Sequence, residues 1–265
     1  MTRIAPVASA AAVLCLPAIA HAQESNEELA KKLNNPVAGL ISVPFQFNYD
    51  EGFGPDDGAR YTLNIQPVMP VHITPDWNLI IRTILPVIYR ERTSPTTGAA
   101  QGLGDTTQSF FFSPSSPKNG VTWGIGPAFL WPTGESELGS KKWGAGPTAI
   151  VLKQQGGFTY GVLANHIWSY ADLGHNDRPS VSSTFIQPFL SWTSRSATTL
   201  GINTESTYNW KSKAWTIPVN MSISHLYNFG GQRVSLGGTV KVYAAREEGG
   251  PEWGARFIAT FLFPR

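Results

Sequence analysis

Seven polar residues stand out because they lie in segments where polar and apolar side chains alternate. Three are cations, one is a carboxylate and three are amides. In an enclosed space such groups can select a polar or anionic solute, or the cations can pair with a carboxylate and nearly close that space. Both interpretations stay open, although pairing is the commoner arrangement for charges in a confined lumen. These candidate ligand-binding residues are Gln46, Gln66, Arg82, Glu205, Asn220, Lys241 and Arg256.

Histidines form the second group that could do chemistry, because a histidine base can activate a serine nucleophile. His72, His166 and His225 each have serines nearby in the sequence. His166 and His225 also have Trp168 and Tyr227 as close neighbours, so a place among interfacial aromatic residues is the simpler interpretation. No histidine and serine are expected to share a face with an orienting carboxylate or amide. We therefore expect no catalytic residue and no enzyme.

A metal site is also weakly indicated. His175 lies between Asp172 and Asp177 in the polar stretch DLGHNDRPS. Two carboxylates and a histidine could hold a divalent cation, but a solvated loop explains the same residues. The only cysteine, Cys15, belongs to the export signal described below, so the mature chain is expected to have no disulfide, thiol nucleophile or cysteine metal site. We expect neither a metal nor a cofactor.

The composition describes the elements that must position these residues. Only 14% of the residues are charged and 12% are aromatic, whereas about 25% are charged in typical soluble domains. The formal net charge of +2 gives no support for a nucleic-acid partner. The most apolar stretch of the mature chain, LIIRTILPVIY, contains Arg82 and Pro86, so a membrane-spanning helix is not expected. This combination indicates strands with period-two alternation.

Residues 1–22 have the features of a secretory signal peptide. Arg3 supplies the basic start, a mostly apolar stretch follows, and the tripeptide AHA fits the small-x-small cleavage pattern. A membrane anchor is the weaker interpretation, because two prolines interrupt a run that is already short for a bilayer. The mature chain is therefore expected to begin at Gln23 and to be exported.

The mature chain contains twelve segments with strand-like alternation, separated by turn-forming residues. Many reach or exceed the roughly 9 to 11 residues that a tilted strand needs to cross a bilayer, whereas soluble strands average about 5 to 6. The expected segments are 42–50, 60–74, 77–91, 105–114, 121–132, 143–154, 158–170, 181–194, 198–211, 214–227, 232–245 and 252–263.

The connections between these segments are of two alternating kinds. Short links such as TPDW and SRSA take turns with mostly longer, more polar ones such as RTSPTTGAAQGLG. Outer-membrane barrels alternate short periplasmic turns with longer outer loops in this way. We therefore predict an all-β fold: a single transmembrane antiparallel up-and-down β-barrel of about twelve strands at residues 42–265, with both termini on the periplasmic side.

Alternation also predicts which side chains face the inside of the barrel. In the second segment, Tyr61 and Leu63 fall on one face, whereas Thr62 and Asn64 fall on the other. The polar face is mostly Ser, Thr, Asn, Gly and Gln, which suits a lumen. Tryptophans and tyrosines gather near segment ends, as aromatic girdles require. The seven candidate residues fall on the lumen face near mid-barrel, where three cations against one carboxylate would make one wall basic.

Two neighbouring segments contain residues that weaken strands. Pro127 and Pro147 each lack the backbone N–H that a ladder needs, so we predict a bulge or a local break in pairing at both. Glycines beside them, such as Gly126 and Gly146, are expected to face the lumen. There they would leave space for a conduit, an inward-folded loop or the N-terminal segment.

The two ends of the mature chain suggest further contacts. Residues 23–41 form the predicted periplasmic N-terminal segment, in which Leu29 and Leu33 have helical spacing. The short helical stretch could lie across the periplasmic mouth or serve as a solvated tether. The last segment alternates aromatic residues up to Phe263, two residues before the end, and such strands are read by the barrel-assembly machinery. Expected partners are outer-membrane lipid and lipopolysaccharide, that machinery, and a small-molecule solute.

The stretch ELAKKLNNPVAGLISVPFQFNYD at residues 28–50, followed by IQPVMPV and WNLIIRTILPVIY, resembles a bacterial family of proposed outer-membrane transporters. The family is grouped under the name of the phenol meta-degradation pathway, and GIGPAFLWPTG is similar to one of its hallmark segments. The resemblance covers nearly the whole mature chain. It implies a small barrel in the outer membrane of a Gram-negative cell, a transport role and no catalytic residues.

These patterns together predict a passive channel or transporter for small polar, anionic or aromatic molecules in the cell outer membrane. No ATP-binding motif or other energy-coupling sequence occurs, so any transport should follow the gradient of its solute. Two alternatives stay open: a closed barrel with a structural or binding role, and a lipid-modifying outer-membrane enzyme.

Overall fold

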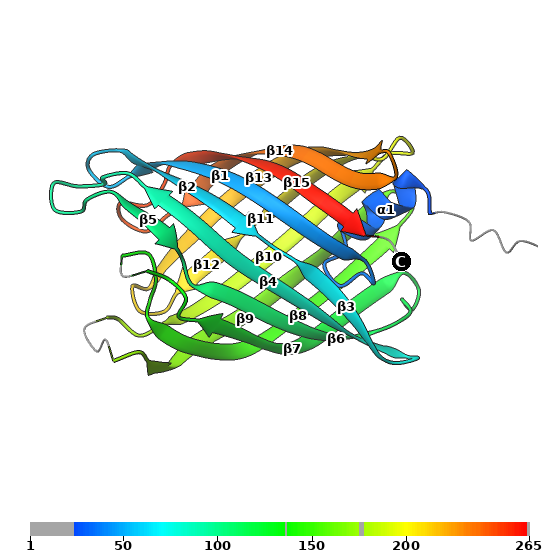
Figure 1. The fold of residues 1–265 in the computed structure, drawn as a ribbon, viewed down its shortest axis with the longest axis horizontal. Helices are drawn as coiled ribbons and strands as arrows, with labels where there is room; N and C mark the ends of the chain where they lie inside the picture. Colours follow the sequence, from blue (N-terminus) through cyan, green and yellow to red (C-terminus); the bar gives the residue numbers. More distant parts are fainter. Residues whose placement is uncertain (1–23, 136, 175–177, 264–265) are drawn as a thin grey trace, which may run out of the picture.

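The chain forms a closed antiparallel barrel with a short helix at one end (Figure 1). The computed structural model describes residues 24–135, 137–174 and 178–263, so the predicted signal peptide lies outside the described residues. Pairing of β1 with β15 and of β9 with β10 completes the ring. The elements are α1 (Asn26–Leu33), β1 (Ile41–Phe53), β2 (Gly58–Ile65), β3 (Val68–Thr74), β4 (Trp77–Arg90), β5 (Ala100–Leu103), β6 (Thr106–Pro114), β7 (Val121–Trp131), β8 (Lys142–Gln155), β9 (Phe158–Asp172), β10 (Ser182–Thr193), β11 (Thr198–Thr204), β12 (Ser206–Asn209), β13 (Ala214–Phe229), β14 (Gln232–Ala245) and β15 (Trp253–Phe263).

The fifteen strand segments of the described residues make twelve barrel strands, because three barrel strands are interrupted. The interruptions lie at residues 66–67 between β2 and β3, at residues 104–105 between β5 and β6, and at Glu205 between β11 and β12. The predicted number of strands and their up-and-down order are thus confirmed. The main difference is β5, which pairs with β4 although its sequence predicts a loop.

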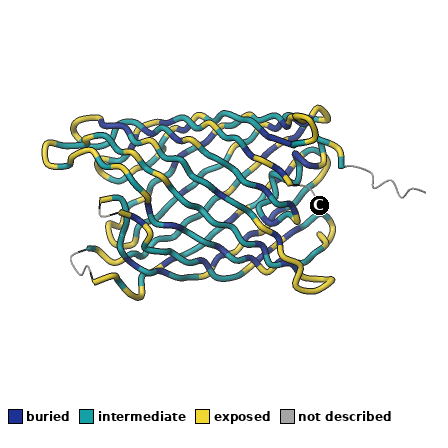
Figure 2. The backbone as a smooth tube through the Cα atoms, in the orientation of Figure 1, coloured by how far each residue is buried: buried dark blue, intermediate teal, exposed yellow. Residues whose placement is uncertain are grey.

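The outer surface of the barrel is apolar along its middle, and exposed residues alternate with less exposed ones along many strands (Figure 2). Met221, for example, points outwards and is 54% exposed. Aromatic pairs gather toward both ends. The rings of Trp131 and Trp143 lie 5.3 Å apart at the end with the longer loops, and those of Trp77 and Trp123 lie 5.7 Å apart toward the opposite end. An apolar belt between two aromatic girdles is the surface of a barrel embedded in lipid.

We call the two ends of the barrel the helix end, where α1 lies, and the loop end, which carries the longer connections (Figure 1). Ser25 caps α1 by a capping box, in which Glu28 N–H donates to Ser25 Oγ and Ser25 N–H donates to Glu28 Oε2, both at 3.2 Å. No helix among the described residues is long and apolar enough to cross a bilayer.

The N-terminal segment is packed into the helix end by two apolar clusters. The first cluster buries the inner face of α1 and consists of Leu29, Ala30, Leu40, Ala197, Leu226 and Leu262. The second holds Val37 between inward side chains of several strands and consists of Val37, Ile80, Phe111, Ile150, Leu152 and Leu163. Residues 25–40 therefore cover the mouth of the barrel, and the alternative of a solvated tether is wrong.

Pro127 and Pro147 lie directly opposite each other in the β7–β8 pair. Next to Pro127 the pairing of β7 with β6 is interrupted, and next to Pro147 the pairing of β8 with β9 is interrupted. A proline has no backbone N–H to donate to the ladder. Each proline therefore breaks the pairing with the strand on the side away from the other proline. The predicted breaks are confirmed at both residues.

The glycines beside these prolines allow neighbouring strands in the wall of the barrel to approach each other closely. An added Cβ at Gly126 would overlap the carbonyl oxygen of Phe110, and one at Gly146 would overlap the carbonyl oxygen of His166. Both close approaches lie where the pairing with the neighbouring strand is interrupted. Whether these glycines also leave space inside stays a prediction. Toward the helix end, this side of the lumen is filled by the second apolar cluster.

Candidate functional site in the barrel lumen

Three of the predicted residues form one hydrogen-bonded chain across neighbouring strands. Arg82 Nη2 on β4 donates to Gln66 Oε1 at 3.1 Å, and Gln66 Nε2 donates to Gln46 Oε1 on β1 at 3.0 Å. Gln66 sits in the interruption between β2 and β3, where its backbone N–H donates to the Pro44 carbonyl at 2.9 Å. In this interruption the backbone N–H of Gln66 keeps a hydrogen-bond acceptor, while the side chain of Gln66 points inwards.

A second network forms around Arg256 on β15. Its guanidinium donates to both carboxylate oxygens of Glu205, at 2.9 and 2.7 Å, and its Nε donates to Asn48 Oδ1 at 2.6 Å. A bidentate pair of this kind is charge-assisted and fixes the planes of both groups. Glu205 lies in the interruption between β11 and β12. Of the two interpretations that the sequence leaves open, the pairing of a cation with the carboxylate is thus realised between Arg256 and Glu205.

Lys241 has a different partner, one that the sequence-based set of candidates omits. Its Nζ lies 2.5 Å from Asp50 Oδ1, and both side chains are almost fully buried, with 4% and 6% exposed. Tyr243 OH also donates to Asp50 Oδ1 at 2.8 Å. The alternation could have found these residues, because Asp50 shares a strand face with Gln46, and Tyr243 shares one with Lys241.

These contacts change the predicted charge of the lumen. Three cations against one carboxylate would leave two positive charges, whereas the structure adds the carboxylate of Asp50. Lys241 and Arg256 are therefore each neutralised by an ion pair. Within residues 24–135, 137–174 and 178–263, no carboxylate lies within 4 Å of the Arg82 guanidinium. Of the three predicted cations, Arg82 alone thus has no carboxylate partner among the described residues.

The seventh candidate, Asn220, lies apart from both networks. Its Nδ2 donates to Asn203 Oδ1 at 2.8 Å, and the residue is fully buried. Strand register places Asn203 and Asn220 opposite each other on β11 and β13. An amide pair buried between adjacent strands stabilises the wall and gives Asn220 no contact with a solute.

A cavity of about 270 Å³ lies between these networks and the N-terminal segment. Gln46, Gln66, Arg82, Glu205 and Arg256 line it on one side. The N-terminal segment lines it on the other side, from residue 30 to residue 40. The lumen is thus a polar compartment that is covered at the helix end.

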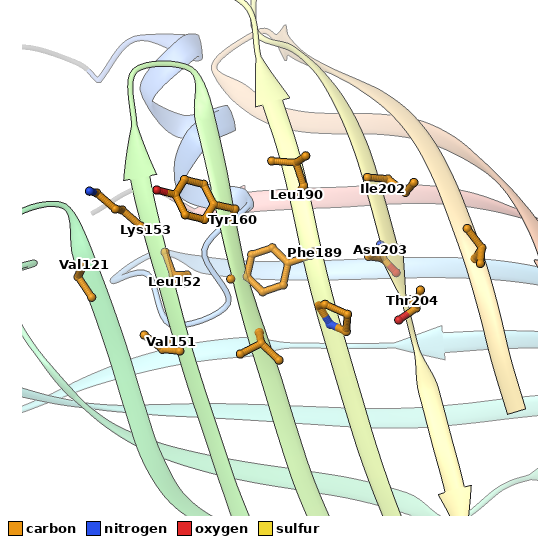
Figure 3. A pocket seen from close by; sticks show the side chains of 14 residues that line it. Val121, Val151, Leu152, Lys153, Tyr160, Phe189, Leu190, Ile202, Asn203 and Thr204 are labelled. Atoms are coloured by element: carbon orange, nitrogen blue, oxygen red, sulfur yellow. The ribbon is translucent and has the colours of Figure 1, made fainter. Parts of the chain in front are cut away.

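A larger hollow lies elsewhere, on the outer face of β8 to β11 (Figure 3). The hollow in Figure 3 measures about 600 Å³ and is lined mainly by apolar side chains such as Val151, Leu190 and Ile202. Lys153 and Tyr160 lie side by side near the turn between β8 and β9. Outward apolar residues of this kind contact lipid in a membrane barrel, so the lumen cavity is the better candidate site.

The histidines have partners that do not form a catalytic triad. His166 Nδ1 lies 2.8 Å from Thr184 Oγ1, which also accepts a hydrogen bond from Trp210 Nε1, and His225 Nδ1 lies 2.8 Å from Thr198 Oγ1. Rings of tryptophan or tyrosine pack against both imidazoles. Both histidines thus take the interfacial aromatic position that the sequence predicts.

The weakly indicated metal site cannot be described, because His175 and Asp177 lie outside the described residues. Among the residues that the structure does describe, no group of three or more His, Cys, Asp and Glu side chains is placed to hold a metal ion.

No protein-family model and no curated protein matches the sequence. The structure is similar to an outer membrane channel from Pseudomonas putida F1, with a TM-score of 0.67 and 14% identity over 85% of this chain and 96% of that chain. The NanC porin follows with a TM-score of 0.50 and 10% identity over 83% and 98%. Outer membrane phospholipase A from Escherichia coli reaches only 0.47, with 10% identity over 84% and 98%, which supports no argument. The chain therefore has the fold of an outer-membrane β-barrel.

Proposed function

We propose that the protein is a passive channel or transporter for small molecules in the outer membrane of a Gram-negative cell. The observation that carries this proposal is the polar lumen, in which two hydrogen-bonded networks face a cavity of about 270 Å³. Side chains just fill a barrel of about eight strands, and the diameter grows with the number of strands, so a twelve-stranded barrel has room for a cavity. A polar compartment inside an apolar wall is what the passage of a polar solute requires.

The lumen also supports a preference among solutes. Among the described charged residues that line the cavity, Lys32 and Arg256 are in ion pairs, whereas Arg82 is in none. Charged rings in a channel favour ions of opposite sign. We propose small polar, anionic or aromatic molecules as the solute class, with anions passing more readily than cations of the same size.

We also propose the remaining features that the sequence predicts. Residues 1–22 direct export, residues 23–41 lie on the periplasmic side, and residues 42–265 form the membrane barrel. The family resemblance to the phenol meta-degradation group, which no family model supports, is part of this proposal. The exterior contacts outer-membrane lipid and lipopolysaccharide, and the last strand, ending at Phe263, is the segment that the barrel-assembly machinery reads.

Planar-bilayer recordings of the purified protein test the channel. We expect discrete conductance steps, and a reversal potential in a salt gradient that shows preference for chloride over potassium. Arg82→Ala should reduce that preference. Heat-modifiable migration on a gel confirms that each preparation is a folded barrel. Folded protein without conductance in bilayers and without solute flux in liposomes would refute the channel.

A closed barrel with a binding role is the second candidate. It is favoured by the N-terminal segment, which covers the helix end through Leu29, Val37 and Leu40. Solute binding without flux would support it. Release of fatty acid from phospholipid by the purified protein would instead support a lipid-modifying enzyme.

A further inference from the structure

We propose that the lumen cavity is a binding site for a small organic monoanion with an apolar body, and that Arg82 is the counterion of its acidic group. This inference rests on the proposed function, since it identifies the class of solute that binds inside the channel. The site combines three observations: the direction of a hydrogen-bonded chain, an uncompensated charge, and the apolar surface that faces them.

The chain from Arg82 through Gln66 to Gln46 has a direction. Each amide oxygen in it accepts a hydrogen bond, from Arg82 Nη2 or from Gln66 Nε2. The chain therefore ends in the Nε2 group of Gln46, for which the described part of the protein provides no acceptor. Both ends of the chain thus present N–H donors, and Arg82 and Gln46 both line the cavity. A row of donors with its oxygens already occupied favours an anion.

The charge of Arg82 supports the same conclusion. All three nitrogens of the Arg256 guanidinium already bond to Glu205 or Asn48. Arg82 has five N–H donors, as any arginine has, and its single side-chain bond within the described residues goes to neutral Gln66. An enclosed cation is stabilised by a counter-charge. Because the networks leave one charge, a monoanion matches the cavity better than a dianion.

The wall that the N-terminal segment forms combines apolar and polar side chains. Ala30, Leu33, Ala38 and Leu40 lie there beside Lys32, Asn34 and Asn35, and Val68 and Ile258 add apolar surface next to Arg82 and Gln46, their register partners. A volume of about 270 Å³ corresponds to about nine water-sized groups at roughly 30 Å³ each. This room accommodates a carboxylate on the Arg82 side together with one aromatic ring or a short aliphatic chain against the leucines. An inorganic ion would leave that apolar surface without a partner.

Isothermal titration calorimetry on the detergent-solubilised full chain tests the site with benzoate as the probe. Benzamide is the neutral control of the same shape, and acetate is the control without an apolar body. We expect benzoate to bind at least about tenfold more tightly than benzamide, because a hydrogen bond to a charged group is worth that ratio or more. Acetate should bind more weakly than benzoate, because it leaves the apolar surface uncovered.

Arg82→Gln should weaken benzoate binding about tenfold or more, while Arg195→Gln should not change it. Arg195 lies exposed in the turn between β10 and β11, so this variant loses the same charge outside the lumen. Heat-modifiable migration verifies that both variants fold. If Arg82→Gln does not fold, the comparison of benzoate with benzamide on the wild-type protein still decides the proposal.

Equal affinity for benzoate and benzamide, or undiminished benzoate binding to folded Arg82→Gln, would overturn the inference. The channel and the site fail in different ways. Conductance without benzoate binding refutes the site and leaves the proposed function intact. Benzoate binding without conductance and without solute flux supports the site and refutes the channel.

Discussion

The ion pair of Glu205 with Arg256 provides the sharpest test of how this lumen works. Glu205→Gln preserves the size and shape of the side chain and one acceptor oxygen, but it removes the negative charge. Within the described residues, the uncompensated charge beside the cavity then rises from one to two, because Arg256 loses its carboxylate partner. The variant should therefore be more selective for anions than the wild type.

The size of the effect follows from Coulomb's law. A unit charge acts on an ion at about 4 Å with about 1 kcal/mol even when the lumen screens like bulk water. That energy corresponds to a factor of about five in permeability. The chloride-to-potassium permeability ratio should thus rise about fivefold or more at roughly 0.1 M salt, where the screening length is about 10 Å.

Reversal potentials in a salt gradient measure this ratio directly. Glu248→Gln is the matched control, because Glu248 is an exposed residue between β14 and β15 and its loss changes the total charge equally. Repeating the measurement at about 1 M salt should shrink the effect, since the screening length falls to about 3 Å. An unchanged permeability ratio in folded Glu205→Gln would refute the view that the charges of Glu205, Arg256 and Arg82 control ion passage.

Three further predictions concern the elements around the site. Lys241→Met leaves Asp50 buried without its cation and should lower the free energy of unfolding by about 3 to 5 kcal/mol; Asp50→Leu added to it should recover part of that loss in urea titrations. Val37→Asp removes about 2 kcal/mol of apolar burial from the N-terminal segment and should raise single-channel conductance by releasing the covered mouth; unchanged conductance would show that the segment is no barrier. Gly146→Ala, whose Cβ would overlap a backbone carbonyl, should destabilise the barrel by about 2 kcal/mol or more, whereas Gly238→Ala, with nothing within 4 Å, should be close to neutral in the same gel-shift melting assay.

Much of the architecture follows from local patterns. Period-two alternation and the two kinds of connection predict twelve strands, their direction and the faces of their side chains, because these properties depend only on neighbours along the chain. The breaks at Pro127 and Pro147 are local for the same reason, since a missing N–H weakens the ladder wherever the strand lies. Five of the seven candidate residues are in the two lumen networks, and Lys241 reaches the second one through Asn48.

What the sequence leaves open is decided by contacts between distant strands. Strand tilt and shear set the relative height of side chains around the barrel. Only the tertiary structure therefore shows that Lys241 pairs with Asp50 and that Arg82 has no carboxylate partner within the described residues. The close approach of Gly146 to the His166 carbonyl and the packing of Val37 among inward side chains likewise depend on how separate segments meet in space. The sequence alone determined a barrel with a polar interior. The tertiary structure decided which charge in that interior remains available to a solute, because ion pairs form by proximity in space.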